Sequence, residues 1–183
     1  MNKIAPSIFA ILLGSALPAY PANNAVSVST VQTLTPNALV ICGGSGQAAA
    51  SCTKDGYTID VSDCKGDALY GVVASTGGVA LATSLSPSSK DLTARLKKGQ
   101  FVCIAATARK AGDQRHYVVA IPTASVPRCK GNDLCKGGDK AVLWERAGVG
   151  DACRRFGKNG DYAGQCAAGW VNEADLDQYA NGL

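Results

Sequence analysis

The sequence predicts a mainly β protein, built as a small barrel with an N-terminal extension and a long insertion before the last strand. Short apolar segments recur along the middle of the chain between glycine- and proline-containing turns, as expected for antiparallel strands. Residues 70–108 and 169–176 have the pattern of the front and the back of one barrel. The polar, glycine-rich segment between them contains four cysteines. We therefore expect one barrel that is interrupted by an insertion.

The chain divides into three predicted parts. These are a signal peptide at 1–19, an extension with strands at 20–66, and the barrel at 67–183 with its insertion at 122–168. Strands are expected at 38–42, 57–61, 69–74, 79–82, 100–107 and 116–121. Residues 100–107 are apolar on both faces, which favours a central strand.

The first residues predict export. A basic start at 1–3 precedes an apolar run at 4–18, and small residues around Ala19 supply a cleavage site, with Ala22 as a second choice. The alternative is a membrane anchor, but the run is short for a hydrocarbon layer of about 30 Å. We expect a periplasmic or secreted protein without a transmembrane span.

The cysteines all follow the predicted signal peptide and are even in number, which in an exported chain predicts disulfides. They are Cys42, Cys52, Cys64, Cys103, Cys129, Cys135, Cys153 and Cys166. The two short spacings favour local pairs within 129–135 and 153–166, and the other four would tie the extension to the barrel. Zinc is the competing interpretation, but there is no CxxC and only one histidine, so we predict no metal and no cofactor.

The charge of the chain is mildly basic, at +4, which is too little to indicate nucleic-acid binding. Basic residues cluster between 90 and 115. We interpret this cluster as a solvated face of the barrel. The alternative is a docking surface for an acidic partner or an anionic wall polymer.

Several of these segments together resemble the bacterial Src-homology-3-like family. The matching pieces are, in order, Gly71–Val73, Val79–Leu81, Leu96–Ile104 and Gly169–Val171, followed by Leu176. They correspond to an opening strand, a long loop, a leucine-x-lysine-glycine turn into a strand, and a closing glycine-tryptophan-valine. The resemblance covers about half of the mature chain and implies an SH3-like barrel. The chain departs from the family at 82–85, which lacks the usual arginine, and in the length of the insertion.

We expect disulfides to keep the insertion ordered, because it has no hydrophobic core of its own. Within it, 142–146 is predicted as a short strand or helical turn, and 156–163 as a loop. After the insertion, 175–179 is predicted as a last helical turn.

Catalysis is not supported by the residue pattern. His116, the only histidine, lies on a predicted strand beside Arg115 without the partners of a triad, so we interpret it as an exposed strand residue. A cysteine nucleophile would need a thiol outside the disulfides. Glu173, Asp175 and Asp177 are spaced as in a solvated turn and not as glycosidase carboxylates. We predict that the protein is not an enzyme, with a small enzyme using His116 as a remaining hypothesis.

Binding is the better supported class, because aromatic rings can stack on sugar or peptide. The candidate ligand-binding residues are Tyr70, Tyr117, Trp144, Tyr162 and Trp170, with closure of the barrel core as the alternative role of Trp170. We predict an exported binding module of the bacterial cell envelope that contacts cell-wall glycopeptide (peptidoglycan) or another envelope protein. The alternative is a periplasmic inhibitor or immunity protein whose insertion blocks a cell-wall hydrolase.

Overall fold

The computed structural model of the protein describes residues 41–42, 52–62, 64, 68–87, 91–145, 152–156, 161–179 and 183. The predicted signal peptide lies outside these residues. Within the described part the protein is mainly β, as predicted, and no helix there is long and apolar enough to cross a membrane.

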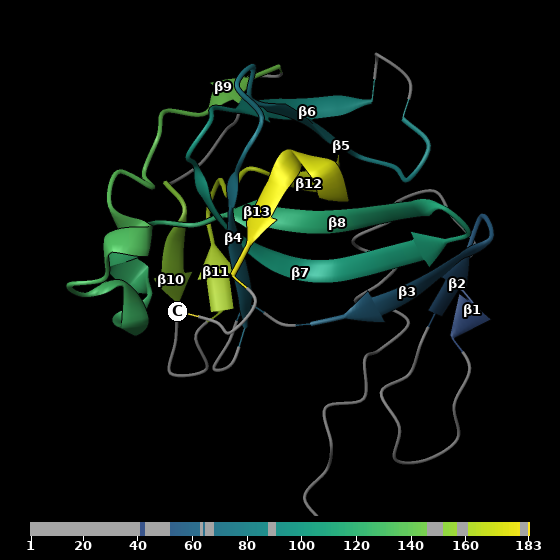
Figure 1. The fold of residues 1–183 in the computed structure, drawn as a ribbon, viewed down its shortest axis with the longest axis horizontal. Helices are drawn as coiled ribbons and strands as arrows, with labels where there is room; N and C mark the ends of the chain where they lie inside the picture. Colours follow the sequence, from purple (N-terminus) through teal and green to yellow (C-terminus); the bar gives the residue numbers. More distant parts are fainter. Residues whose placement is uncertain are drawn as a thin grey trace, which may run out of the picture.

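The strands and short 3-10 helices follow one another as shown in Figure 1. They are β1 (Ile41–Cys42), β2 (Cys52–Lys54), β3 (Tyr57–Val61), β4 (Leu69–Val73), β5 (Val79–Ala82), β6 (Leu92–Leu96), β7 (Phe101–Lys110), β8 (Asp113–Ala120), η1 (Thr123–Ser125), η2 (Pro127–Cys129), η3 (Asp133–Cys135), β9 (Leu143–Trp144), β10 (Arg154–Phe156), β11 (Asp161–Ala163), β12 (Ala168–Asn172), η4 (Glu173–Asp175) and β13 (Leu176–Gln178).

The long hairpin of β7 and β8 is the centre of the sheet (Figure 1). Along its other edge β7 pairs first with β4 and then with β3, so that the extension continues the same sheet. The apolar residues on both faces of β7 explain this position. Val102 and Ile104 join one core cluster, whereas Phe101 and Cys103 join another. The prediction of a central strand is confirmed, and β7 runs three residues beyond the expected end at 107.

The sheet is not closed into a barrel, in contrast to the prediction. Strands β13, β4, β7, β8 and β12 are antiparallel neighbours in that order, and β5, β6 and β9 continue from β12. No pairing among the described strands joins β9 back to β13. The outer edge of β6 is taken by β9 of the insertion, in the register Ala94↔Trp144, and is therefore unavailable for closure.

The main core fills the space that the curved sheet encloses. Its buried residues come from seven strands and from the segment before β12, and they are Val73, Val79, Leu81, Ala94, Leu96, Val102, Ile104, Val118, Ala120, Ala167, Val171 and Leu176. A second cluster around Trp170 and Ile59 joins the extension to β12. Burial of apolar area at about 25 cal/mol per Å² is the main contribution of such clusters to stability.

Gly169 lets β12 approach β5 closely. A Cβ atom at this position would lie 2.7 Å from Ala82 O and 2.9 Å from Leu81 Cβ, so any larger residue would push the strands apart. The next two residues alternate, with Trp170 in the second cluster and Val171 in the main core. The glycine-tryptophan-valine motif thus combines a close approach with two buried anchors.

The insertion has more regular structure than expected. Segment 156–163 was predicted as a loop, but its described ends belong to β10 and β11, which pair from Arg154↔Ala163 to Phe156↔Asp161. The disulfide beside this hairpin keeps Cys153 and Cys166 within 4.6 Å, Cα to Cα, which brings the two short strands together. The expected short strand near 142–146 is present as β9. The helical turn predicted at 175–179 comes earlier, as η4, and 176–178 form β13 instead.

Three disulfides are described, and they fit the cysteine prediction. The two local bridges, Cys129–Cys135 and Cys153–Cys166, are those that the spacing favours. Cys64–Cys103 ties the end of the extension to β7. Cys52 is also disulfide-bonded, and no free cysteine is found in the described part of the chain. This degree of oxidation indicates an oxidising, exported environment.

Candidate functional site

The five aromatic candidates do not form one surface. Trp170 and Tyr117 meet edge to face, with ring centroids 5.3 Å apart. Tyr70 and Tyr162 belong to a different region, near the insertion, and Trp144 lies on β9. The five rings are therefore divided among three places in the fold.

Tyr70 is a core residue and not a ligand platform. It is buried and stacks on Phe101, with ring centroids 5.4 Å apart. Burial raises the pKa of its hydroxyl, and the neighbouring Tyr162 acts in the same direction. Tyr162 is half-buried, and its hydroxyl lies 2.9 Å from Ser125 Oγ, so that it links β11 to η1. Neither ring presents an open face comparable with that of Trp144, which is 40% exposed.

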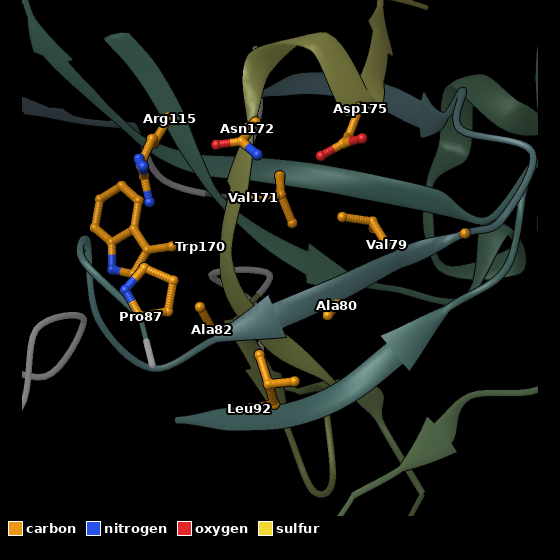
Figure 2. A pocket seen from close by; sticks show the side chains of 11 residues that line it. Val79, Ala80, Ala82, Pro87, Leu92, Arg115, Trp170, Val171, Asn172 and Asp175 are labelled. Atoms are coloured by element: carbon orange, nitrogen blue, oxygen red, sulfur yellow. The ribbon is translucent and has the colours of Figure 1, made fainter. Parts of the chain in front are cut away.

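Trp170 is also buried, at 1% exposure, as a member of the second cluster. Its edge nevertheless lines a groove between the β5–β6 hairpin and β12–η4. The groove has a volume of about 250 Å³. Figure 2 shows its lining: small and apolar residues of β5 and β6 form one wall, and β12 with η4 forms the other.

The groove carries opposite charges at its two ends. Arg115 lies beside Trp170 and Pro87, whereas Asp175 lies on the far side of Asn172 (Figure 2). A cation and a carboxylate with an exposed amide between them suit a ligand that has both charges and a polar backbone, such as a short peptide.

Neighbouring groups hold the two charged residues in place. Arg115 Nε donates to Asp113 Oδ2 at 3.2 Å, and the same carboxylate accepts a hydrogen bond from the Tyr57 hydroxyl. The bond from Tyr57, followed by that from Arg115, lowers the pKa of Asp113. At the other end, the Ala74 N–H donates to the backbone oxygen of Asp175 at 2.9 Å, which ties η4 to β4.

His116 is buried, at 1% exposure, so its interpretation as an exposed strand residue is wrong. It lies on β8 between Thr107 of β7 and Val171 of β12, and the residues on both sides cover its ring. Thr107 Oγ1 is 3.1 Å from Nδ1, and Gln178 Nε2 is 3.0 Å from Nε2. With the Gln178 amide in this orientation its nitrogen donates to Nε2, which places the proton on Nδ1 and leaves the ring neutral.

The electrostatic surroundings of His116 agree with a neutral ring. Burial lowers its pKa, and of its charged neighbours Glu173 raises it and Arg109 lowers it. Gln114 Nε2 also approaches the ring, at 3.4 Å, and donates to Glu173 Oε1 at 2.8 Å. This arrangement locks β13 and η4 onto the central hairpin and leaves no open position for a substrate at the ring.

A metal site is not formed by the described residues, among which no group of three histidine, cysteine or acidic side chains could hold an ion. The acidic trio is divided between two elements, with Glu173 and Asp175 on η4 and Asp177 on β13. Of these three, Asp175 alone lines the groove.

Sequence reasoning missed the charged Arg115 and the polar Asn172 at the groove, and also Pro87. Each belongs to a different segment, and the pairing of β12 with both β8 and β5 brings them together. One local signal was available, since Asn172 directly follows the glycine-tryptophan-valine motif. Comparison of the chain with protein-family models, with curated proteins and with solved structures found no match.

Proposed function

We propose that the protein is a periplasmic or secreted Src-homology-3-like binding module of the bacterial cell envelope, whose groove holds a peptide segment of peptidoglycan or of an envelope protein. The observation that carries this proposal is the strand order β13-β4-β7-β8-β12. Along the chain, the 3-10 helix η4 connects β12 to β13. The family resemblance implies an opening strand, a long loop, a turn into a strand, a return strand and a closing glycine-tryptophan-valine strand, and β4, the β5–β6 region, β7, β8 and β12 follow one another along the chain in that order. The main departure is that the sheet does not close, because the outer edge of β6 pairs with β9 of the insertion.

The position of the groove supports a binding role. It lies between the long β5–β6 hairpin and the strand–turn segment β12–η4, so that two loops and a rigid sheet define it. Binding residues are commonly found on loops that a rigid scaffold positions. The charge pair Arg115 and Asp175 favours a peptide that carries both a carboxylate and an amine, as wall peptides do.

Retention on purified wall sacculi tests the proposal. We expect the wild-type protein to co-sediment with sacculi, and the double variant Arg115→Gln, Asp175→Asn to lose most of this retention. The matched control is Arg95→Gln, Asp177→Asn, which changes the same charges at two residues that do not line the groove. Equal retention of both variants would exclude the groove. Absence of wild-type retention would exclude the wall as ligand, and cross-linking to envelope proteins would then test the other partner class.

A second candidate function, inhibition of a cell-wall hydrolase, is favoured by the loop that Cys129–Cys135 closes. Leu134 at its tip is 51% exposed, yet its backbone is held on both sides. Its N–H donates to Asn132 Oδ1 at 3.0 Å, and its carbonyl accepts from the Tyr179 hydroxyl at 2.8 Å. A pre-ordered apolar side chain loses little entropy on entering a cleft. Inhibition of a wall hydrolase that Leu134→Asp abolishes would establish this function.

A further inference from the structure

A second cavity lies where the insertion meets the sheet, away from the groove. Its volume is about 410 Å³, within the range typical of small-molecule sites. The end of β8 and Ala167 give it an apolar floor, and Val142 adds to this floor from the insertion. It shares no lining residue with the groove.

The rim of the cavity combines an aromatic ring with polar side chains. Trp144 lines it and is 40% exposed, although the backbone of this residue is fixed by pairing with Ala94. Lys140, Asp139 and Gln165 supply the polar part of the lining. An exposed tryptophan next to a concave surface can cover the face of a ligand ring at low entropy cost.

The segments that form the rim are held in place. Lys140 N donates to the buried Gln100 Oε1 at 2.9 Å, so that this part of the insertion is anchored to the start of β7. Asp139 accepts from Thr123 N and Oγ1 at 2.8 and 2.7 Å. The opposite wall contains Cys153, which the bridge to Cys166 restrains. The cavity is therefore built before a ligand arrives, which reduces the cost of binding.

The charge of the insertion favours an anionic ligand. Residues 122–168 contain eight basic and five acidic side chains, whereas residues 169–183 contain three acidic and no basic ones. The insertion, which carries the rim, therefore has a net charge of +3, against −3 for the segment that follows it. Such an asymmetry attracts anions at a distance and adds to local pairing.

We propose that this cavity binds a sugar that carries a carboxylate, with its ring against Trp144 and its carboxylate at Lys140. The apolar floor and the aromatic rim suit the C–H face of a pyranose, and the polar side chains suit its hydroxyl groups. An extended peptide cannot bind here by addition to a strand edge, which is one of the common modes of peptide recognition. Here the edge of β6 nearest the cavity is already paired with β9. This proposal is independent of the groove, so a failure of the protein to co-sediment with sacculi would not contradict it.

Fluorescence of the wild-type protein provides the first test, without any substitution. The chain has two tryptophans, and Trp170 is 1% exposed, so quenching by acrylamide reports mainly on Trp144. We expect short oligomers of polygalacturonate to protect this fluorescence from acrylamide, and dextran oligomers of equal length not to do so. Equal protection by dextran would refute the role of the carboxylate, and no protection by either would refute the site.

Calorimetry on variants provides the second test. Trp144→Ala should weaken binding of oligogalacturonate at least about tenfold, and Trp144→Phe should restore most of the affinity. Lys140→Gln should weaken it about two- to fivefold and reduce its dependence on salt. Leu134→Ala, an exposed apolar residue outside the cavity, is the control and should bind as the wild type does. Tighter binding of oligoglutamate than of oligogalacturonate would overturn the proposal in favour of an acidic peptide.

Discussion

Removal of the Cys64–Cys103 bridge should destabilise the protein more than removal of either local bridge. In the chain-entropy model a disulfide lowers the entropy of the unfolded chain by about 2.1 + 1.5R ln n cal/mol/K, where n is the number of residues in the loop. The separations are 39 residues for Cys64–Cys103 and 6 for Cys129–Cys135. The model then assigns about 3.9 and about 2.2 kcal/mol at 25 °C, a difference of about 1.7 kcal/mol.

The two pairs are well matched for this comparison, because each has one buried and one half-buried cysteine. Cys103 and Cys135 are buried, and Cys64 and Cys129 are half-buried, so that replacement by alanine removes similar packing. We expect the Cys64→Ala, Cys103→Ala variant to lose about 8–16 °C in Tm, at about 2–4 °C per kcal/mol for a chain of this size. Urea denaturation of both double variants gives the free energies of unfolding directly. The loop-length argument fails if the Cys129→Ala, Cys135→Ala variant loses as much stability as the other, or more.

Three further predictions concern the sheet and its attachments. Burial lowers the pKa of His116 below its usual 6.5, so the unfolded chain takes up a proton more readily than the folded protein does. The contribution of His116 to stability is therefore fully present above pH 6.5 and is lost as the pH drops towards the folded-state pKa. His116→Gln should flatten this part of the pH profile of stability, and an unchanged profile would contradict the neutral buried ring. Gly169→Ala should lower the free energy of unfolding by about 1–3 kcal/mol through the clash with β5. Gly77→Ala, where a Cβ meets nothing within 4 Å, should lower it far less. Equal losses of the two variants in chemical denaturation would contradict a role of the close approach. Asp139→Ala removes two hydrogen bonds to η1 and should cost about 1–2 kcal/mol, with faster amide exchange confined to the insertion, and a global increase in exchange would argue against a local role.

The local sequence pattern was sufficient to predict those strands that have a clear apolar run between turn residues. The predicted strands 57–61 and 79–82 have the observed bounds, because alternating or β-rich runs there are flanked by turn residues. The hairpin β10–β11 was missed because its strands are three residues long, which is too short for an alternating pattern to show, and a nearby disulfide brings them together. His116 was misplaced for a related reason: its neighbours in sequence are polar, and its burial comes from β12 and β13, which follow about fifty residues later.

The candidate site was harder to predict than the fold. Aromatic residues were chosen because rings bind ligands, but the same rings are the best core anchors in a chain in which aromatics are 6% of residues. Tyr70 and Trp170 are buried in the core. Of the five aromatic candidates, Trp144 alone presents a half-exposed ring to a cavity. The polar residues that line the groove have no common pattern in the sequence, so only the strand order identifies them.

The amino-acid sequence by itself determined that this is a mainly β, disulfide-bonded chain, because strand periodicity, turn residues and cysteine spacing are local properties. It also determined which strand is central, since β7 alone combines length with apolar residues on both faces. The tertiary structure decided that the sheet stays open and which side chains line the groove. Those features depend on which edge pairs with which, and the occupation of the β6 edge by a strand from the insertion is a contact between segments about fifty residues apart that no local pattern encodes.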